Sequence, residues 1–261
     1  AAAPGYFVNT SAAVSQTAAS VGYYVPDVAA ITSLAAPAGF YVATSASPSA
    51  TPASAGYYVP GSAASSQTDA SLGYYVPGTG ASRQTAAGLG YYVDATGASS
   101  QTAATAGFFV GLTGQSAAQR AAPGSYVSSS GASAATLASK GYFVPFSGAS
   151  SQQAAPPGYF VDTVGATGAK NAELGYYVSL SGASSQTAAS LGYFVDASAA
   201  ITQTAAPVGY FVGQTGQSAA VRASAGYYVA TTGASAATPA SKGFFVPVAG
   251  ASAQQAAALG Y

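Results

Sequence analysis

A glycine recurs every 17 residues along the whole chain, with no insertion or deletion between its copies. The corner glycines that open the repeats include Gly5, Gly22, Gly39, Gly56, Gly73 and Gly90, and the series continues to Gly260. Loops of globular domains tolerate insertions, whereas a repeat packed between identical neighbours must keep its length so that its backbone hydrogen bonds stay in register. The constant period therefore predicts one structural unit, written fifteen times and stacked on itself.

The repeat has a clear consensus when each copy is numbered from its glycine as position 1. It reads G-Y-Y/F-V-x-x-x-G/A-A-S-S-Q/A-T-A-A-x-L/A, and Gly at position 1, Val at position 4 and Ala at position 15 never vary in the full copies. A glycine fits a corner because it alone adopts positive φ angles without steric cost. Position 8 is always Gly or Ala, which indicates that another group comes close to it.

Two short extended segments lie between the corners, at positions 2 to 5 and 9 to 13. We therefore predict an all-β fold, a β-solenoid (β-helix) of about fifteen 17-residue coils, which runs as a single continuous repeat domain over residues 1–261. Successive coils would stack about 4.8 Å apart. The high content of Gly, Ser, Thr and Pro argues against helices.

The distribution of charge predicts which positions face water. Charged residues such as Arg83, Lys170 and Asp69 occur at positions 11, 13 and 14, so we place these positions outside. Positions 10, 12 and 15 carry no charge and are expected inside. Leu72 and Leu191, at position 17, are expected to add apolar burial.

Composition excludes several classes of function. Charged residues make up only 5% of the chain, six basic residues balance six acidic ones, and His and Cys are absent. Without clustered basic residues we expect no nucleic-acid partner. Without His or Cys we expect no metal site, no cofactor and no catalytic residues, so that the protein is not an enzyme. No apolar run is long enough for a membrane span.

Adjacent aromatic residues at positions 2 and 3 are the most distinctive part of the repeat. Side chains at these two positions point to opposite faces of a strand, so one face should lie outside. Its constancy has two explanations that both stay open: the aromatic column stabilises itself, or it contacts a partner. The candidate assembly column consists of Tyr6, Tyr23, Tyr57, Tyr74, Tyr91, Tyr142, Tyr159, Tyr176, Tyr193, Tyr210 and Tyr227.

A longer period lies above the 17-residue repeat. Residues 90–157 reappear as residues 192–259, six repeats or 102 residues later, and Gly114–Arg120 matches Gly216–Arg222. Duplication of a six-repeat block explains this spacing. A lateral contact period of the same length is the alternative.

The repeat that starts at Gly56, Gly-Tyr-Tyr-Val-Pro followed by Ala-Ser-Ser-Gln-Thr-Asp-Ala, resembles the tandem repeats of large bacterial surface and secreted proteins of adhesin type. More distantly it is similar to the cysteine-rich repeats of ephrin-receptor type, without the cysteines. The resemblance implies an extracellular or cell-surface structural role.

Together these features predict a structural, self-assembling extracellular fibre or surface-stalk segment. Its expected partners are other copies of itself, end to end or laterally, and a glycan is a further candidate. The alternative is an ice-binding or polysaccharide-binding solenoid, in which regular threonines at position 13 order water or tyrosines stack on sugar rings. Position 13 is interrupted by residues such as Leu34 and Lys170, which disfavours a flat ice-binding face.

Overall fold

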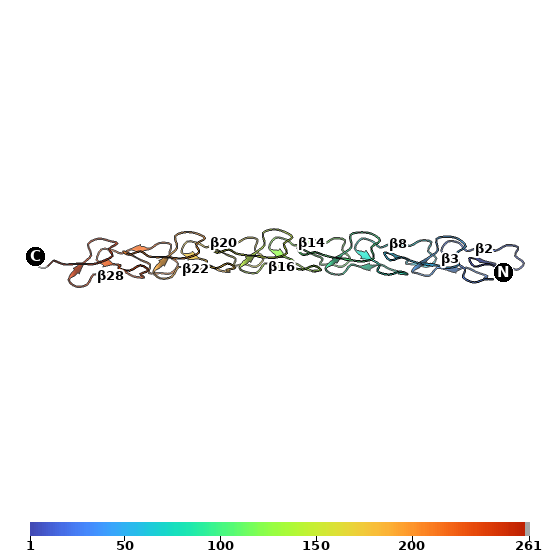
Figure 1. The fold of residues 1–261 in the computed structure, drawn as a ribbon, viewed down its shortest axis with the longest axis horizontal. Coiled ribbons are helices and arrows are strands. Elements are labelled where there is room, and N and C mark those ends of the chain that lie inside the picture. The colour runs from blue at the N-terminus through green and yellow to red at the C-terminus, as the bar shows by residue number, and fades with distance from the viewer. Residues whose placement is uncertain (259–261) are drawn as a thin grey trace. The chain divides into compact units, whose positions relative to one another are not determined.

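The protein is all-β. The computed structural model describes residues 1–258, and these contain no helix and thirty strands of two residues each. The last glycine of the series, Gly260, lies outside the described residues. The chain divides into two compact bodies, an N-terminal body (Ala1–Ala121 and Val127–Ala135) and a C-terminal body (Ala122–Tyr126 and the residues from Thr136 onward). Within each body the repeats follow one another in chain order (Figure 1).

Each repeat contributes one strand at positions 2 and 3 and a second at positions 13 and 14. The first strands are β1 (Tyr6–Phe7), β3 (Tyr23–Tyr24), β5 (Phe40–Tyr41), β7 (Tyr57–Tyr58), β9 (Tyr74–Tyr75), β11 (Tyr91–Tyr92), β13 (Phe108–Phe109), β15 (Ser125–Tyr126), β17 (Tyr142–Phe143), β19 (Tyr159–Phe160), β21 (Tyr176–Tyr177), β23 (Tyr193–Phe194), β25 (Tyr210–Phe211), β27 (Tyr227–Tyr228) and β29 (Phe244–Phe245). The second strands are β2 (Thr17–Ala18), β4 (Leu34–Ala35), β6 (Thr51–Pro52), β8 (Thr68–Asp69), β10 (Thr85–Ala86), β12 (Thr102–Ala103), β14 (Gln119–Arg120), β16 (Thr136–Leu137), β18 (Gln153–Ala154), β20 (Lys170–Asn171), β22 (Thr187–Ala188), β24 (Thr204–Ala205), β26 (Val221–Arg222), β28 (Thr238–Pro239) and β30 (Gln255–Ala256).

The two strands of one repeat pair with each other and are antiparallel. In the sixth repeat, Tyr91 lies opposite Ala103 and Tyr92 lies opposite Thr102. The Ala104 N–H closes the hairpin by donating to the Gly90 carbonyl at 2.8 Å. The strands are therefore shorter than the expected segments at positions 2 to 5 and 9 to 13, and the described strands form no sheet that runs from repeat to repeat.

A tight turn connects each hairpin to the next. The Tyr91 N–H donates to the Gly88 carbonyl at 3.1 Å, and Gly90 at the third position of this turn has a φ of 80°. A positive φ at that position is the geometry of a type II turn, which requires glycine. Gly90 thus lies in a tight turn with a positive φ. Position 17 lies at the second position of the turn and faces solvent, so the expectation that Leu72 and Leu191 are interior is wrong: they are 50% and 51% exposed.

Within each body, backbone hydrogen bonds join a repeat to the next two. The Gly90 N–H donates to the Val110 carbonyl of the following repeat at 2.9 Å, and the Val93 N–H donates to the Gln115 carbonyl of that repeat at 3.0 Å. The Gly131 N–H, at position 8 two repeats after Gly90, donates back to the Ala104 carbonyl at 2.8 Å. A repeat therefore makes backbone hydrogen bonds both to the adjacent repeat and to the second repeat along the chain.

The core is a narrow column of valines and alanines. Val at position 4 and Ala at position 15 are buried in most repeats, as Val76 (1% exposed) and Ala87 (0%) illustrate. Ala at position 15 was expected inside and this is confirmed. Position 10 was also expected inside, and this is wrong, since Val14 and Ile31 are 103% and 73% exposed. The reason is that positions 4 to 12 form the loop of the hairpin, where the alternation of a strand does not apply.

The glycine at position 1 lies where three repeats meet. Besides its hydrogen bonds to the next repeat and to its own hairpin, its Cα faces the carbonyl of position 8 two repeats later. A Cβ placed on Gly90 would lie 2.0 Å from the Gly131 carbonyl oxygen, and one placed on Gly73 would lie 2.0 Å from that of Gly114. Any side chain at position 1 would separate these repeats.

Position 8 also has a left-handed backbone, but it has more room. Gly97 has a φ of 67°, and a Cβ there would meet only Asp69 Oδ1 at 3.6 Å and the Tyr57 ring and hydroxyl at 3.9 Å or more. Alanine is accordingly found at this position with φ of 55° to 60°, in Ala12, Ala29, Ala46, Ala63 and Ala199. Each such alanine carries the cost of a left-handed conformation, about 1 kcal/mol.

We predict that Gly90→Ala and Gly97→Ala destabilise the chain by very different amounts. Gly97→Ala should lower the free energy of unfolding by about 1 kcal/mol, the cost of the left-handed backbone alone. Gly90→Ala adds a steric clash with the backbone and should cost about 3 kcal/mol or more. Urea unfolding followed by circular dichroism measures both. Equal losses for the two variants would contradict the three-repeat contact at position 1.

Candidate functional site

The aromatic side chains at position 2 lie over position 8 of the repeat two further along. A Cβ on Gly131 would be 3.8 Å from the Tyr91 hydroxyl oxygen, and one on Gly80 would be 3.9 Å from Phe40 Cζ. Most of the predicted column is half-buried, and its most exposed members are Tyr23, Tyr91, Tyr159 and Tyr227, at 36% to 45%. The small residue at position 8 thus has a structural cause, because it makes room for an aromatic ring.

The one repeat without an aromatic at position 2 supports this explanation. Ser125 stands there, and its cross-strand partner is Leu137 instead of the usual small residue of position 14. Leu137 Cδ2 would be 3.2 Å from a Cβ on Gly165. The leucine therefore covers the position-8 glycine that an aromatic ring covers elsewhere.

A glutamine at position 12 joins neighbouring repeats through its side chain. Its Oε1 accepts a hydrogen bond from the N–H of position 16 in the preceding repeat, as Gln101 does from Gly88 at 2.8 Å. The same contact is made by Gln16, Gln67, Gln84, Gln152, Gln186, Gln203 and Gln254, at 2.7 to 3.0 Å. The residues of a single repeat do not predict this contact, because its donor belongs to the preceding repeat.

Prolines at position 16 coincide with the loss of this glutamine. Pro37, Pro156 and Pro207 have no N–H to donate, and position 12 of the following repeat is then alanine, in Ala50, Ala169 and Ala220. The glutamine is thus absent where its hydrogen-bond donor is absent. This pairing of two positions thirteen residues apart is the sequence signal that could have revealed the contact.

Position 12 lacks glutamine although position 16 of the preceding repeat keeps its N–H in four places, at Ser33, Ala118, Ala135 and Ala237. Open hollows lie at Ala118 and at Ala237. The first, of about 290 Å³, is lined by Tyr92, Asp94, Thr105, Phe108, Ser116, Ala117 and Ala118. The second, of about 330 Å³, is lined by Phe211, Ser224, Tyr227, Ala236 and Ala237. Both are built from the same five repeat positions, namely 3 and 16 of one repeat and 2, 11 and 12 of the next. They form the candidate functional sites of the chain.

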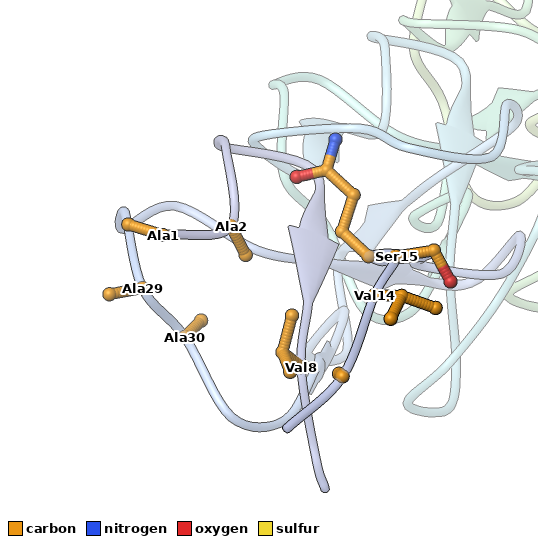
Figure 2. A pocket seen from close by; sticks show the side chains of 9 residues that line it. Ala1, Ala2, Val8, Val14, Ser15, Ala29 and Ala30 are labelled. Atoms are coloured by element: carbon orange, nitrogen blue, oxygen red, sulfur yellow. The ribbon is translucent and has the colours of Figure 1, made fainter. Parts of the chain in front are cut away.

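A larger hollow of about 470 Å³ lies beside Val8 in the first repeat. Figure 2 shows residues that line it, among them Ala2, Val8, Val14 and Ala30. We assign no ligand to this hollow.

Charged residues are sparse in this chain. Within residues 1–258, no group of three or more His, Cys, Asp or Glu side chains could hold a metal ion, and no helix could cross a membrane. The three aspartates of position 5, Asp94, Asp162 and Asp196, belong to different, non-adjacent repeats. Lys170 Nζ donates to Asp162 Oδ2 at 2.9 Å, and the Arg120 guanidinium lies 5.4 Å from the centre of the Phe108 ring.

The threonines considered for ice binding are exposed on the second strand of the hairpin. Thr17, Thr68, Thr85, Thr102, Thr187 and Thr204 all face solvent. Leu34, Gln119, Gln153, Lys170 and Val221 occupy the same position in other repeats and are also exposed. The threonines therefore form no uninterrupted row.

No protein-family model and no curated protein matches this chain.

We predict that the glutamine contact stabilises the array only where a donor is present. Gln101→Ala should lower stability by about 1 kcal/mol, since it removes the acceptor of the Gly88 N–H. Ala118→Gln should raise stability by up to about 1 kcal/mol, because the Thr105 N–H can donate to it. Ala50→Gln is the matched control and should give no gain, because Pro37 has no N–H. Equal effects of Ala118→Gln and Ala50→Gln on the urea midpoint would refute the contact.

The ion pair of Asp162 predicts a pH effect of known sign. The hydrogen bond from Lys170, followed by the charge of Lys170, holds the pKa of Asp162 below its ordinary value of 3.8. The ion pair therefore stabilises the folded chain fully when the pH is above the ordinary pKa of the unfolded state. This stabilisation is lost as the pH falls through the lowered pKa of the folded state. The contribution is small because both side chains are largely exposed. Lys170→Thr, which installs the usual residue of position 13, should raise the pKa of Asp162 in an NMR titration, and an unchanged pKa would exclude the pair in solution.

Proposed function

We propose that this chain is a structural segment of an extracellular fibre or surface stalk, a β-solenoid-like stack of hairpins that assembles with other copies of itself. The observation that carries the proposal is the pattern of backbone hydrogen bonds between repeats. Within each of the two bodies, a repeat is bonded to the next and to the second next, as Gly90 to Val110 and Ala104 to Gly131 illustrate. A repeat thus cannot move without breaking bonds to several others, which gives mechanical stiffness along the stack.

The composition of the core and the low charge of the chain support a structural role in preference to an enzymatic one. The buried side chains of the described residues are valines and alanines, with no buried polar or charged side chain. The low charge of the chain allows close approach of neighbouring copies, because little like-charge repulsion opposes it. An extracellular or cell-surface location is part of this proposal.

The exposed parts of the aromatic column are the proposed lateral contact. Tyr23, Tyr91, Tyr159 and Tyr227 are the tyrosines of position 2 with the largest exposed fraction. Tyrosine suits such a contact because its ring offers apolar area while its hydroxyl stays hydrated. Position 6 carries other exposed apolar residues, among them Leu112, Phe146 and Leu180, and these provide a comparison surface.

Cryo-electron microscopy of the purified chain, without added ligand, tests the proposal. We expect filaments much longer than one chain. A variant with Ser in place of Tyr23, Tyr91, Tyr159 and Tyr227 should lose lateral association, and serine is chosen because Ser125 occupies this position naturally. Far-UV circular dichroism checks that the variant is folded.

The matched control replaces Leu112, Phe146 and Leu180 with Ser. This variant removes as much exposed apolar surface from the loops but should assemble like the parent chain. Particles of the unmodified chain that stay single and uniform at high concentration would overturn self-assembly. Loss of filaments in the control but not in the tyrosine variant would move the contact to the hairpin loops.

A further inference from the structure

The two hollows described above are places where the structure lacks a group that it carries elsewhere. In eight repeats, a glutamine carboxamide oxygen accepts the N–H of position 16 in the preceding repeat. At Ala118 and Ala237 the carboxamide is missing. Within the described residues, the N–H groups of Thr105 and Ser224 then donate to no protein atom. Both residues are exposed, so a ligand can reach these donors.

The walls of each hollow are aromatic. Tyr92 and Phe108 line the first, and Phe211 and Tyr227 line the second, in each case one ring from each of two successive repeats. Arg120 lies over the Phe108 ring, which helps to hold that ring in place. Aromatic faces carry partial negative charge and attract the C–H groups of a sugar ring. The volumes, about 290 and 330 Å³, are at the small end of ligand sites and suit one ring.

The glutamine contact of the other repeats indicates which group should occupy the polar end. It is an amide oxygen, which accepts one hydrogen bond from the backbone N–H. An acetamido group on a sugar carries the same oxygen. The first hollow adds the Asp94 carboxylate and the Ser116 hydroxyl, an acceptor and a donor suited to sugar hydroxyls. These extra groups favour a sugar over the amide side chain of a peptide.

We propose that these two hollows bind N-acetylated hexosamine residues of a glycan, with the acetamido oxygen accepting the N–H of Thr105 or Ser224 and the sugar ring lying against the aromatic walls. The second hollow has glycine, Gly213, where the first has Asp94. Its affinity should therefore be lower. This proposal does not depend on self-assembly of the chain.

Titration of the full chain with chitotetraose, an oligomer of N-acetylglucosamine, tests the proposal by calorimetry and by chemical-shift changes at the Thr105 and Ser224 amides. Cellotetraose, which has the same backbone without acetamido groups, is the ligand control. We expect chitotetraose to bind at least tenfold more tightly than cellotetraose. Ala118→Gln combined with Ala237→Gln should abolish binding, because the new carboxamides fill both sites as in the other repeats while the fold is kept.

A second variant separates the hydrogen bond from the aromatic walls. Thr105→Pro combined with Ser224→Pro removes both donors, and proline stands at this position naturally in Pro37, Pro156 and Pro207. It should lower the affinity for chitotetraose to that for cellotetraose. Binding of chitotetraose that is unchanged in the glutamine variant would overturn the proposal, as would no binding by the unmodified chain. Displacement of these amide signals by a glutamine-containing peptide but not by either sugar would overturn the ligand class.

Discussion

The fold depends on the contact between the Cα of the glycine at position 1 and a backbone carbonyl two repeats later. This contact leaves no room for a Cβ, since one on Gly90 would lie 2.0 Å from the Gly131 oxygen. The same glycine donates its N–H to the next repeat and accepts the N–H of Ala104 in its own hairpin. Hairpin closure and stacking therefore both depend on this residue. At Gly226 and Gly243 an added Cβ would meet no atom of the described residues within 4 Å, and there the positive φ alone favours glycine.

Side chains around this contact adjust to one another in pairs. An aromatic ring at position 2 needs a small residue at position 8 two repeats later, and where Ser125 replaces the ring, Leu137 extends over Gly165. A glutamine at position 12 needs an N–H at position 16 of the repeat before it, and Pro37 is followed by Ala50. Much of the sequence variation among repeats therefore occurs in pairs of residues that contact each other across repeats. The pairing has four exceptions, at Ser33, Ala118, Ala135 and Ala237, where the preceding repeat keeps its N–H although no glutamine is present. Two of them, at Ala118 and Ala237, line the hollows.

The sequence predicted the period, the glycine corner, the all-β class and the burial of Ala at position 15. It could not predict the direction of pairing, because in a perfect tandem repeat a strand meets the same residues whether it pairs within its own copy or with a neighbouring one. The absence of charge at position 10 predicts an inward side chain, but this position lies in the hairpin loop, where uncharged side chains such as Val14 and Ile31 face solvent. The hollows could not be predicted from a single repeat, because each is lined by residues of two successive repeats.

The hydrogen bonds described above reach no further than the second neighbouring repeat. A gene for such an array can gain or lose whole copies by recombination between its own repeats, and only the contacts at the new junction change. The block of residues 90–157 recurs 102 residues later, a spacing of six whole repeats, as expected if whole copies are gained or lost. Loss of a single codon, by contrast, would misalign every bond across that point. The architecture therefore tolerates change in length by 17 residues far better than by one, and length is the property that such a gene can alter most freely.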